Sequence, residues 1–363
     1  MNHRQSPRTH QNDIDEPHYS RMPSTRYLGS KRKLLPALHA VFTELNFSVA
    51  ADPFCGSGAV SYLLKTMGKE VIAQDALHWN VIGTRAVLSS PVTNLDTVLQ
   101  QVFDSIDKSN AAPGFVEQNF KDVFFTDEEN CFLDRFMLAV STLSQPQKDV
   151  VMFALFQAAL AKRPYNLFHR ANLYMRTNDV KRSFGNKTTW DASFETLIRK
   201  NAAELARAQF VSERKMTVNH RRAEDSDFSN AQLVYLDPPY VSKRGTGVDY
   251  LDYYHFLEGL CMSDVGDWKR QMLMRYKHRP LAGRGNNQWC KPNDILRQFE
   301  MVLKRCRHAI VVISYRNDGI PSIDELTQVL KRNGKTVERI DCGTYVYALS
   351  KNNRSKEMIL VGR

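Results

Sequence analysis

The chain of 363 residues holds 50 Lys and Arg residues against 39 Asp and Glu residues, a formal net charge of +11. This balance favours a polyanionic partner such as nucleic acid, or an acidic membrane surface. No apolar run approaches the length of a membrane span, the polar N-terminus predicts no signal peptide, and the six cysteines form no C-x-x-C pair. We therefore expect a reduced intracellular protein without a metal site.

The N-terminal part of the chain is predicted to begin with a disordered tail, residues 1–25, because this stretch is polar and charged and offers little to bury. A Gly29-Ser30 turn follows, and then an amphipathic helix to about residue 47.

A glycine-containing loop between two predicted strands outlines a nucleotide-type pocket. A strand at 49–51 runs into Asp52-Pro53-Phe54-Cys55-Gly56-Ser57-Gly58, and a second strand at 70–74 ends in Asp75. Helices are expected after each strand, at 59–66 and 78–88. Glycines let backbone amides approach a ligand, and an acid after the second strand is placed to bind ribose hydroxyls. Taken alone, the loop could equally be a structural turn and Asp75 a surface or capping carboxylate, since neither a Walker loop nor a full dinucleotide fingerprint is present.

The middle of the chain is predicted to be mostly helical. Capping-box spacing at Thr126 opens a helix to about residue 143, and a very apolar helix runs from Pro146 to Arg163. A third helix, capped by Thr189 or Asp191, is expected to reach about residue 210.

A basic segment at 162–187 separates the last two of these helices. Seven Lys and Arg residues stand there against one acid, Asp179, a net charge of +6, and Asn and aromatic residues are interleaved with them. Basic groups grip phosphates, while Asn and Arg can read base edges. The predicted DNA contacts are Arg163, Asn166, Arg170, Arg176, Lys181, Arg182 and Lys187. A plain basic surface loop is the alternative, and the basic insertion from 243 to 284 could also clamp DNA.

The second half of the chain returns to strand patterns. Strands are expected at 217–220, 233–236 and 309–315, a helix at 295–304 closes a long polar insertion from 241 to 305, a further helix spans 323–332, and two antiparallel strands follow at about 344–349 and 357–361.

The strand at 233–236 runs directly into Asp237-Pro238-Pro239-Tyr240. The two prolines fix the backbone between a carboxylate and an aromatic ring, at the end of a strand where open α/β sheets bind ligands. This arrangement offers a planar guest hydrogen-bond acceptors and a stacking face.

Four motifs in order carry a resemblance to the D12-class (Dam-like) DNA adenine-N6 methyltransferases. They are Tyr27-Leu28-Gly29-Ser30-Lys31, the loop 52–58, Asp75 and Asp237-Pro238-Pro239-Tyr240. The first motif usually reads W-x-G-G-K, so Tyr27 and Ser30 depart from the pattern while keeping an aromatic and a small residue. The resemblance implies a Rossmann-like class I α/β sheet formed by 26–110 and 211–363, with a mostly helical target-recognition domain at 111–210. It also places the protein in the cytoplasm of a prokaryotic or phage-infected cell.

The resemblance further implies S-adenosylmethionine as the methyl donor. Lys31 would bind its carboxylate, Asp52 its ammonium group, Asp75 its ribose, and either Glu224 or Asp225 its adenine amino group. Tyr27 would pack on the cofactor, and Phe54, Gly56, Gly58 and Asp237 complete the expected cofactor site. Asp237 and the Pro238 carbonyl would accept the N6 protons of a flipped adenine, with Pro239 fixing the turn and Tyr240 stacking on the base.

The expected activity is therefore site-specific methylation of adenine N6 in double-stranded DNA. A methyltransferase acting on structured RNA, and a nucleic-acid-binding protein that has lost catalysis, are the alternatives. A cognate restriction endonuclease is a candidate partner that the sequence does not decide.

Overall fold

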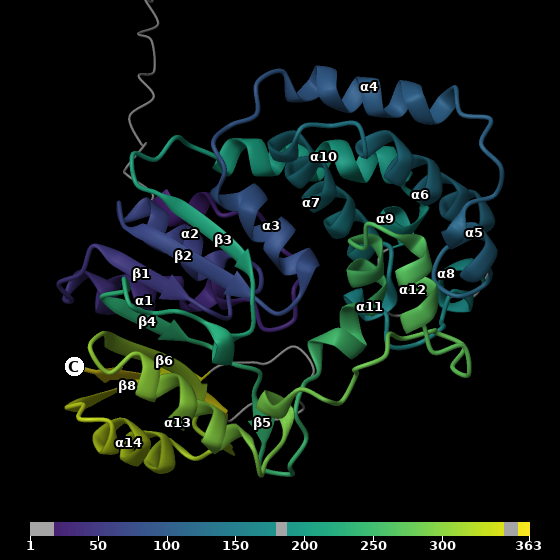
Figure 1. The fold of residues 1–363 in the computed structure, drawn as a ribbon. Helices are drawn as coiled ribbons and strands as arrows, with labels where there is room; N and C mark the ends of the chain where they lie inside the picture. The colour runs from purple at the N-terminus through teal and green to yellow at the C-terminus, as the bar shows by residue number, and fades with distance from the viewer. Residues whose placement is uncertain (1–17, 179–186, 345–354) are drawn as a thin grey trace, which may run out of the picture.

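The computed structural model describes residues 18–178, 187–344 and 355–363, which form a mixed α/β fold around a seven-stranded sheet (Figure 1). Its strands are β1 (Val49–Asp52), β2 (Glu70–Asp75), β3 (Met216–His220), β4 (Leu233–Leu236), β6 (Ile310–Arg316), β8 (Val337–Thr344) and β9 (Lys356–Gly362). They lie in the order β3-β2-β1-β4-β6-β9-β8, and β9 runs in the direction opposite to that of the other six strands. The carboxyl ends of β1, β2 and β4 therefore meet at one edge.

Both faces of the sheet are covered by helices. Successive strand residues point to opposite sides of the sheet, so the buried apolar residues of each strand supply a core on either face. Ala50 and Tyr235 lie in one core and Ala51 and Leu236, each one residue further on, in the other. The helices over the first core are α1 (Leu35–Thr43), α2 (Ala59–Thr66) and α3 (His78–Leu88), and those over the second are α13 (Ile295–Arg305) and α14 (Ile323–Arg332). A separate two-stranded ribbon pairs β5 (Val241–Ser242) with β7 (Gly319–Ile320).

A helical layer lies beside the sheet, at the upper right of Figure 1. It comprises α4 (Leu95–Asp107), α5 (Phe115–Asn119), α6 (Asp127–Val140), α7 (Gln145–Ala161), α8 (Tyr174–Thr177), α9 (Lys187–Asp191), α10 (Phe194–Ala208), α11 (Tyr250–Leu260) and α12 (Val265–Gln271). Helix α7 packs against both α10 and α3, so the layer is joined to the sheet. Its core draws on α4 and α11 as well, and thus extends beyond the predicted 111–210.

The predicted disordered tail needs a correction. Residues 1–17 lie outside the described part of the chain, but residues 18–25 are in place and begin with a 3-10 turn, His18–Arg21. The side chain of Met22 is only 1% exposed, within the core under α1 and α2, and the Ser24 amide donates to Glu204 Oε1 at 2.6 Å. Tyr19 also packs against this core, so two apolar side chains in a polar stretch hold it in place.

Three further differences concern element boundaries. Ser193, rather than Thr189 or Asp191, caps α10, because its hydroxyl accepts from the amide of Thr196 while α9 already occupies residues 187–191. The strand predicted at 344–349 begins at 337 instead, and residues 345–349 lie outside the described residues. Helices α11 and α12 fall in the insertion that the sequence left without structure. No described helix has the length and apolarity that crossing a membrane requires.

Candidate active site

A cavity of about 370 Å³ lies at the carboxyl ends of β1, β2 and β4. Pockets of this size typically hold cofactors and small ligands. The predicted site residues that line it are Tyr27, Lys31, Asp52, Phe54, Gly56, Asp75, Glu224, Asp237 and Pro239. The predicted residues Gly58, Asp225, Pro238 and Tyr240 are not among its lining.

Asp52, at the end of β1, is a buried carboxylate with one oxygen to spare. Its Oδ2 accepts a hydrogen bond from Ser61 Oγ at 2.7 Å, whereas Oδ1 is buried without a hydrogen-bond partner among the described residues. The pKa of Asp52 is raised to about 7, chiefly by burial and in part by the nearby carboxylates of Asp237 and Asp75, although the Ser61 bond lowers it. A cation beside Oδ1 would satisfy this oxygen and favour the ionised form.

Asp75, at the end of β2, ties the glycine loop to the turn that follows the strand. Its Oδ2 accepts from the amide of Gly56 at 3.0 Å, and Oδ1 from the amide of Leu77 at 2.9 Å. Burial raises the pKa of Asp75 to about 6, although these hydrogen bonds lower it. Gly56 has φ +49°, and a Cβ there would lie 3.0 Å from the ring of Tyr27, so the loop needs a glycine at this position.

Gly58 does not line the cavity, and its role is structural. It precedes α2 with φ +75°, and a Cβ there would lie 3.1 Å from Thr84 Oγ1. The residue lets α2 start close to α3, and its predicted contact with a cofactor has no support from the cavity lining.

Asp237 follows β4 and lies near Asp52 because β4 pairs with β1. Its Oδ2 forms an ion pair with Lys31 Nζ at 2.7 Å. Its Oδ1 accepts from Tyr240 Oη at 3.0 Å and from Ser314 Oγ at 3.1 Å. The carboxylate is thus held in one orientation by groups from three separate parts of the chain.

Tyr240 lies behind Asp237 rather than in the cavity wall. Its hydroxyl also hydrogen-bonds the buried carboxylate of Glu357, and Lys31 Nζ lies 4.8 Å from the centre of its ring. A phenol carries one proton, so Tyr240 donates to Asp237 or to Glu357 at any moment. Glu357 and Ser314 come from β9 and β6 and had no signal in the sequence beyond the strand pattern.

Aromatic rings form another wall of the cavity. Tyr27 stacks on Tyr250 with ring centres 5.3 Å apart and an interplanar angle of 2°, and Tyr254 lies beside it at 5.6 Å. The hydroxyl of Tyr254 accepts from the amide of Leu28 at 2.7 Å. Tyr250 and Tyr254 lie in the first half of α11, inside the long polar insertion for which no helix was predicted before residue 295, and were therefore missed.

The geometry distinguishes Glu224 from Asp225. Glu224 lines the cavity, and its carboxylate is held by Arg222 at 2.6 Å and by Trp289 Nε1 at 3.1 Å. These groups lower the pKa of Glu224 although burial opposes them. Asp225 is exposed and does not line the cavity, so the structure favours Glu224 of the two residues that the sequence left open.

Comparison with known protein families and sequences identifies the family of this chain. A family model of the D12 class of N6 adenine-specific DNA methyltransferases matches residues 27–259. The chain belongs to this family. It is 26% identical over 347 residues, 93% of this chain and 96% of the other, to the type II methyltransferase M2.HphI of Haemophilus parahaemolyticus. It is 21% identical to the type II methyltransferase M.NlaIII of Neisseria lactamica, over 85% of this chain and 88% of that one. Against the modification methylase LlaI of Lactococcus lactis subsp. lactis it is 23% identical, over 85% of this chain and 48% of that protein.

This D12-class methyltransferase is an N6-adenine DNA methyltransferase, and the class uses S-adenosylmethionine as methyl donor. The mixed α/β fold with its mostly parallel seven-stranded sheet is consistent with that assignment. The cavity fits such a donor: Asp52 Oδ1 and Asn80 Oδ1 belong to lining residues and are buried with no partner among the described residues. Such oxygens call for a ligand that donates hydrogen bonds.

Two predicted DNA contacts in the methyltransferase are wrong, because Arg163 and Arg176 are buried in the helical layer. Arg163 is 1% exposed and donates to the backbone oxygens of Phe124 at 3.0 Å and of Arg170 at 2.9 Å. Arg176 is 9% exposed and pairs with Glu129 at 2.7 Å. Both guanidinium groups brace the loop that follows α7, and neither is available to a phosphate.

The other predicted contacts divide between surface and undescribed residues. Arg170 is exposed, Asn166 is half-buried, and Lys187 is exposed with an ion pair to Asp191 at 3.2 Å. Lys181 and Arg182 lie outside the described residues. The Phe168 amide donates to the Tyr253 carbonyl of α11 at 2.9 Å, which brings this loop within one helical turn of Tyr250 in the cavity wall.

Proposed function

We propose that the protein methylates N6 of adenine at a specific site in double-stranded DNA, with the target base turned out of the helix to reach Asp237. The position of Asp237 carries this proposal. It is fixed by Lys31, Tyr240 and Ser314 at a cavity that Asp52 and Asp75 also line, so acceptor and donor would meet there. An adenine within a duplex is stacked and paired, and must leave the helix to enter such a cavity.

We infer that the sheet is of the Rossmann-like class I methyltransferase type. The strand order and the single antiparallel strand β9 support this. The helical layer would then be the target-recognition part, with α11 and α12 added to the predicted inserted domain because they share its core.

S-adenosylmethionine, when bound, supplies a methyl group activated by a sulfonium centre. We assign its ammonium group to Asp52, its ribose hydroxyls to Asp75, its adenine amino group to Glu224 and its carboxylate to Lys31, with Tyr27 packing on it. The spare Oδ1 of Asp52 supports the first assignment, and the buried ends of β1 and β2 support the second. Lys31 already pairs with Asp237, so it would link the donor site to the acceptor site.

The residues around Asp237 address the chemical difficulty of the reaction. Adenine N6 is a poor nucleophile because its lone pair is delocalised into the ring. Asp237 and the Pro238 carbonyl would accept the two N6 protons, which favours a pyramidal nitrogen with an available lone pair. A carboxylate oxygen accepts up to two hydrogen bonds, so Oδ2 can bind an N6 proton beside Lys31, and Asp237 would then be in contact with the proton that is released.

Tyr240 is proposed to stack on the flipped base, with Pro239 holding the turn. Support comes from Pro239 in the cavity lining and from the hydroxyl of Tyr240 tied to Asp237. Lys31 lies over the ring of Tyr240, so the base would share this aromatic surface with a cation.

DNA would be read by two exposed segments that pack on α11. One is the loop 164–174, where Tyr165 is 61% exposed with φ +62° and Tyr174 is 60% exposed beside the exposed Arg170. The other is the hairpin closed by the Met272–Leu281 bridge, which exposes Arg275 and Lys277. A non-glycine residue with positive φ costs energy, and such strain is concentrated at functional surfaces.

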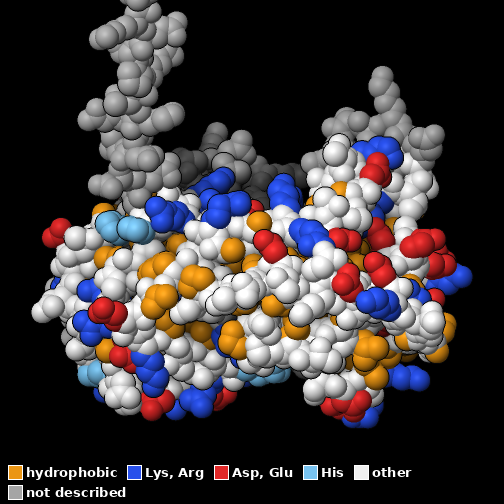
Figure 2. All heavy atoms as spheres, turned by 90° about the horizontal axis from the view of Figure 1, so that it is seen from above, with side chains coloured by type: hydrophobic (Ala, Val, Ile, Leu, Met, Phe, Trp, Pro, Cys, Tyr) orange, Lys and Arg blue, Asp and Glu red, His pale blue; other side chains and the backbone are white. Residues whose placement is uncertain are grey.

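The positive charge of the protein is unevenly spread. On the face that carries α4 and α10, one group of Lys and Arg side chains lies along the upper part of the view, while acidic side chains are most frequent toward its right-hand end (Figure 2). This upper group of basic side chains is a candidate surface for a polyanion.

Methyl transfer from labelled S-adenosylmethionine to duplex DNA and to structured RNA, in separate assays, tests the proposal. We expect N6-methyladenine in duplex DNA at one sequence. Transfer to RNA alone, or binding without transfer, would overturn it. The relatives include type II methyltransferases and a modification methylase, so a cognate restriction endonuclease remains a proposed partner. Mapping N6-methyladenine in DNA from expressing cells identifies the sequence that such an enzyme would cut.

A further inference from the structure

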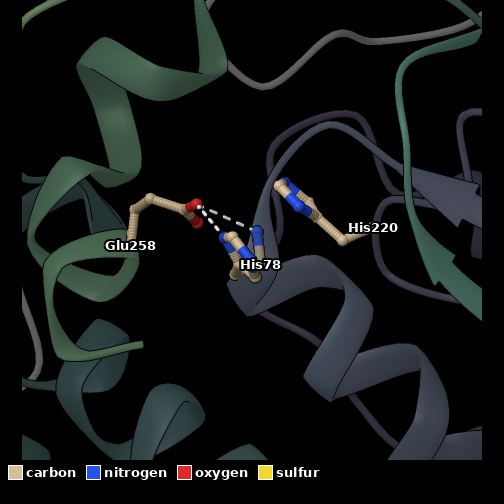
Figure 3. Close-up of side chains that lie close together, drawn as sticks. All are labelled: His78, His220 and Glu258. Carbon is tan, nitrogen blue, oxygen red and sulfur yellow. Dashed lines mark hydrogen bonds and ion pairs between the residues drawn. The ribbon is translucent and has the colours of Figure 1, made fainter. Parts of the chain in front are cut away.

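Three potential metal ligands from distant parts of the chain meet beside the cavity (Figure 3). His78 begins α3, His220 ends β3, and Glu258 lies near the end of α11. One possible ligand atom from each lies within 4.8 Å of the other two. We propose that these residues form a binding site for a divalent transition-metal ion such as Zn²⁺.

The donor set of the cluster selects the kind of ion. Two imidazole nitrogens and one carboxylate oxygen suit Zn²⁺, Co²⁺ or Ni²⁺, whereas Mg²⁺ and Ca²⁺ prefer sites made of oxygen atoms. Three protein ligands leave at least one position of a tetrahedral ion open to water. The 52% exposed side chain of His78 gives an ion access from solvent.

The geometry is close to what a metal ion requires. Ligand atoms at 2.0–2.1 Å from a tetrahedral ion lie about 3.3 Å from one another. His78 Nδ1 and Glu258 Oε1 are already 3.1 Å apart. His220 is the ligand that must move, by at most about 1.5 Å on the same geometry. It is exposed at the end of a strand, with its ring stacked on that of His78 at 3.5 Å and its Nε2 bonded to the Ala76 carbonyl.

Glu258 is held in place by the backbone. Its carboxylate accepts from the amide of His78 at 3.0 Å and from the amide of Trp79 at 3.2 Å, at the N-terminus of α3. Outer hydrogen bonds of this kind fix the orientation of a ligand and strengthen a metal site. The same bonds would also let Glu258 act only as a helix cap, and this is the alternative that an experiment must separate.

An ion at this site would join α3, α11 and β3. Ala76, which bonds His220, and Leu77, which precedes His78, both line the cavity. The ion would therefore brace a turn of the cavity wall without entering the cavity. The sequence showed no sign of the site, because its ligands are separated by 142 and 38 residues and none is a cysteine.

Metal titration of the full chain, stripped of metals with a chelator, tests the site. We expect one Zn²⁺ per chain by calorimetry and a visible spectrum of bound Co²⁺ without thiolate bands. His220→Ala and His78→Ala should each weaken binding at least tenfold. His308→Ala is the matched control, because His308 is also exposed and bonds a backbone carbonyl, that of Phe228, at 3.0 Å.

Thermal unfolding provides a second measurement. At one fixed Zn²⁺ concentration, the Tm of the wild-type protein and of His308→Ala should rise by the same amount, and the Tm of His220→Ala should rise less, because stabilisation of the native state depends on the ratio of ion concentration to Kd. Equal affinities of the wild-type protein and His220→Ala would overturn the proposal, as would Co²⁺ bound through thiolates. His220 lies on the surface, so this variant decides the matter even if His78→Ala fails to fold.

Discussion

The cavity and the basic segment both contain buried charged side chains. They differ in whether those side chains have hydrogen-bond partners within the protein. Asp52 keeps a buried oxygen without a partner among the described residues. Arg163 donates to four oxygens of its own chain, and Lys162 is bonded to Glu129 and to the carbonyl oxygens of Trp190 and Ala192. A buried charge with unused hydrogen-bonding capacity indicates a ligand, whereas one fully bonded within the protein indicates a scaffold.

The largest expected effect is loss of stability on removing Arg163. Arg163→Ala leaves several buried oxygens without donors, each worth about 1–3 kcal/mol, so we expect a loss of about 3–5 kcal/mol in the free energy of unfolding. Urea denaturation measures this. Arg170→Ala is the control on the same loop and should unfold like the wild type. If Arg163→Ala is as stable as the wild type and binds DNA poorly, the arginine belongs to the DNA surface after all.

The second effect concerns the cavity. Asp237→Ala should lower the methylation rate by about 3–4 kcal/mol of transition-state stabilisation, roughly 10²–10³-fold, by analogy with losing a preorganised polar contact. Affinity for S-adenosylmethionine should stay close to that of the wild type, because the residue is assigned to the acceptor. Single-turnover kinetics and equilibrium titration measure the two quantities, with Asp237→Asn as the variant of matched shape. Near wild-type turnover would remove Asp237 from the reaction.

The third effect uses the raised pKa of Asp52. The carboxyl is protonated in the folded protein below about pH 7, and only its ionised form attracts the ammonium group of the donor. Affinity for S-adenosylmethionine should therefore rise as the pH is raised from 5 to 7. The increase should be up to about tenfold, or ~1.4 kcal/mol, for each pH unit, and the affinity should be constant above pH 7. Asp52→Asn should bind more weakly with a flatter profile. An unchanged profile in this variant would assign the ammonium group to another residue.

The smallest effect is expected at the surface of the basic segment. Arg170→Ala should weaken DNA binding with an unchanged affinity for the cofactor. If Arg170 contacts a phosphate, the slope of log K against the logarithm of the salt concentration should become shallower by about one unit, equally on all sequences. If it contacts a base, the free-energy preference for the cognate sequence should instead fall by roughly 1–3 kcal/mol. Binding to cognate and scrambled duplexes over a range of salt concentrations separates these. If nothing changes, the hairpin 272–281 becomes the main candidate.

The sequence predicted the cavity well because strand ends carry their own signal. A short apolar run followed by Asp52, Asp75 or Asp237 places each acid at the carboxyl edge of a parallel sheet, and α2, α3 and α14 were predicted with the bounds that the structure has. Local patterns suffice there, because each residue is positioned by its own strand or loop.

The rest of the site depends on contacts that no local pattern carries. Trp289 and Tyr250 line the cavity, and Glu357 bonds the hydroxyl of Tyr240, from segments far along the chain. In the basic segment, the composition gives the net charge but does not show which side chains point into the protein. Arg163 and Arg176 point inward because they bond to Phe124 and Glu129 in the helical layer. Burial of a long charged side chain is decided by such partners, which composition does not show.

The sharing of one core by α4–α10 and α11–α12 has a consequence for exchanging specificity between relatives. Helix α7 packs on α3, and the loop that carries Arg170 is bonded to α11 through Phe168 and Tyr253. A chimera that replaces only residues 111–210 would break this core in two places and mismatch the loop with its support. If the helical layer is the recognition part proposed above, a transplant of specificity should therefore carry 95–208 and 250–281 as one unit, because these segments share one core.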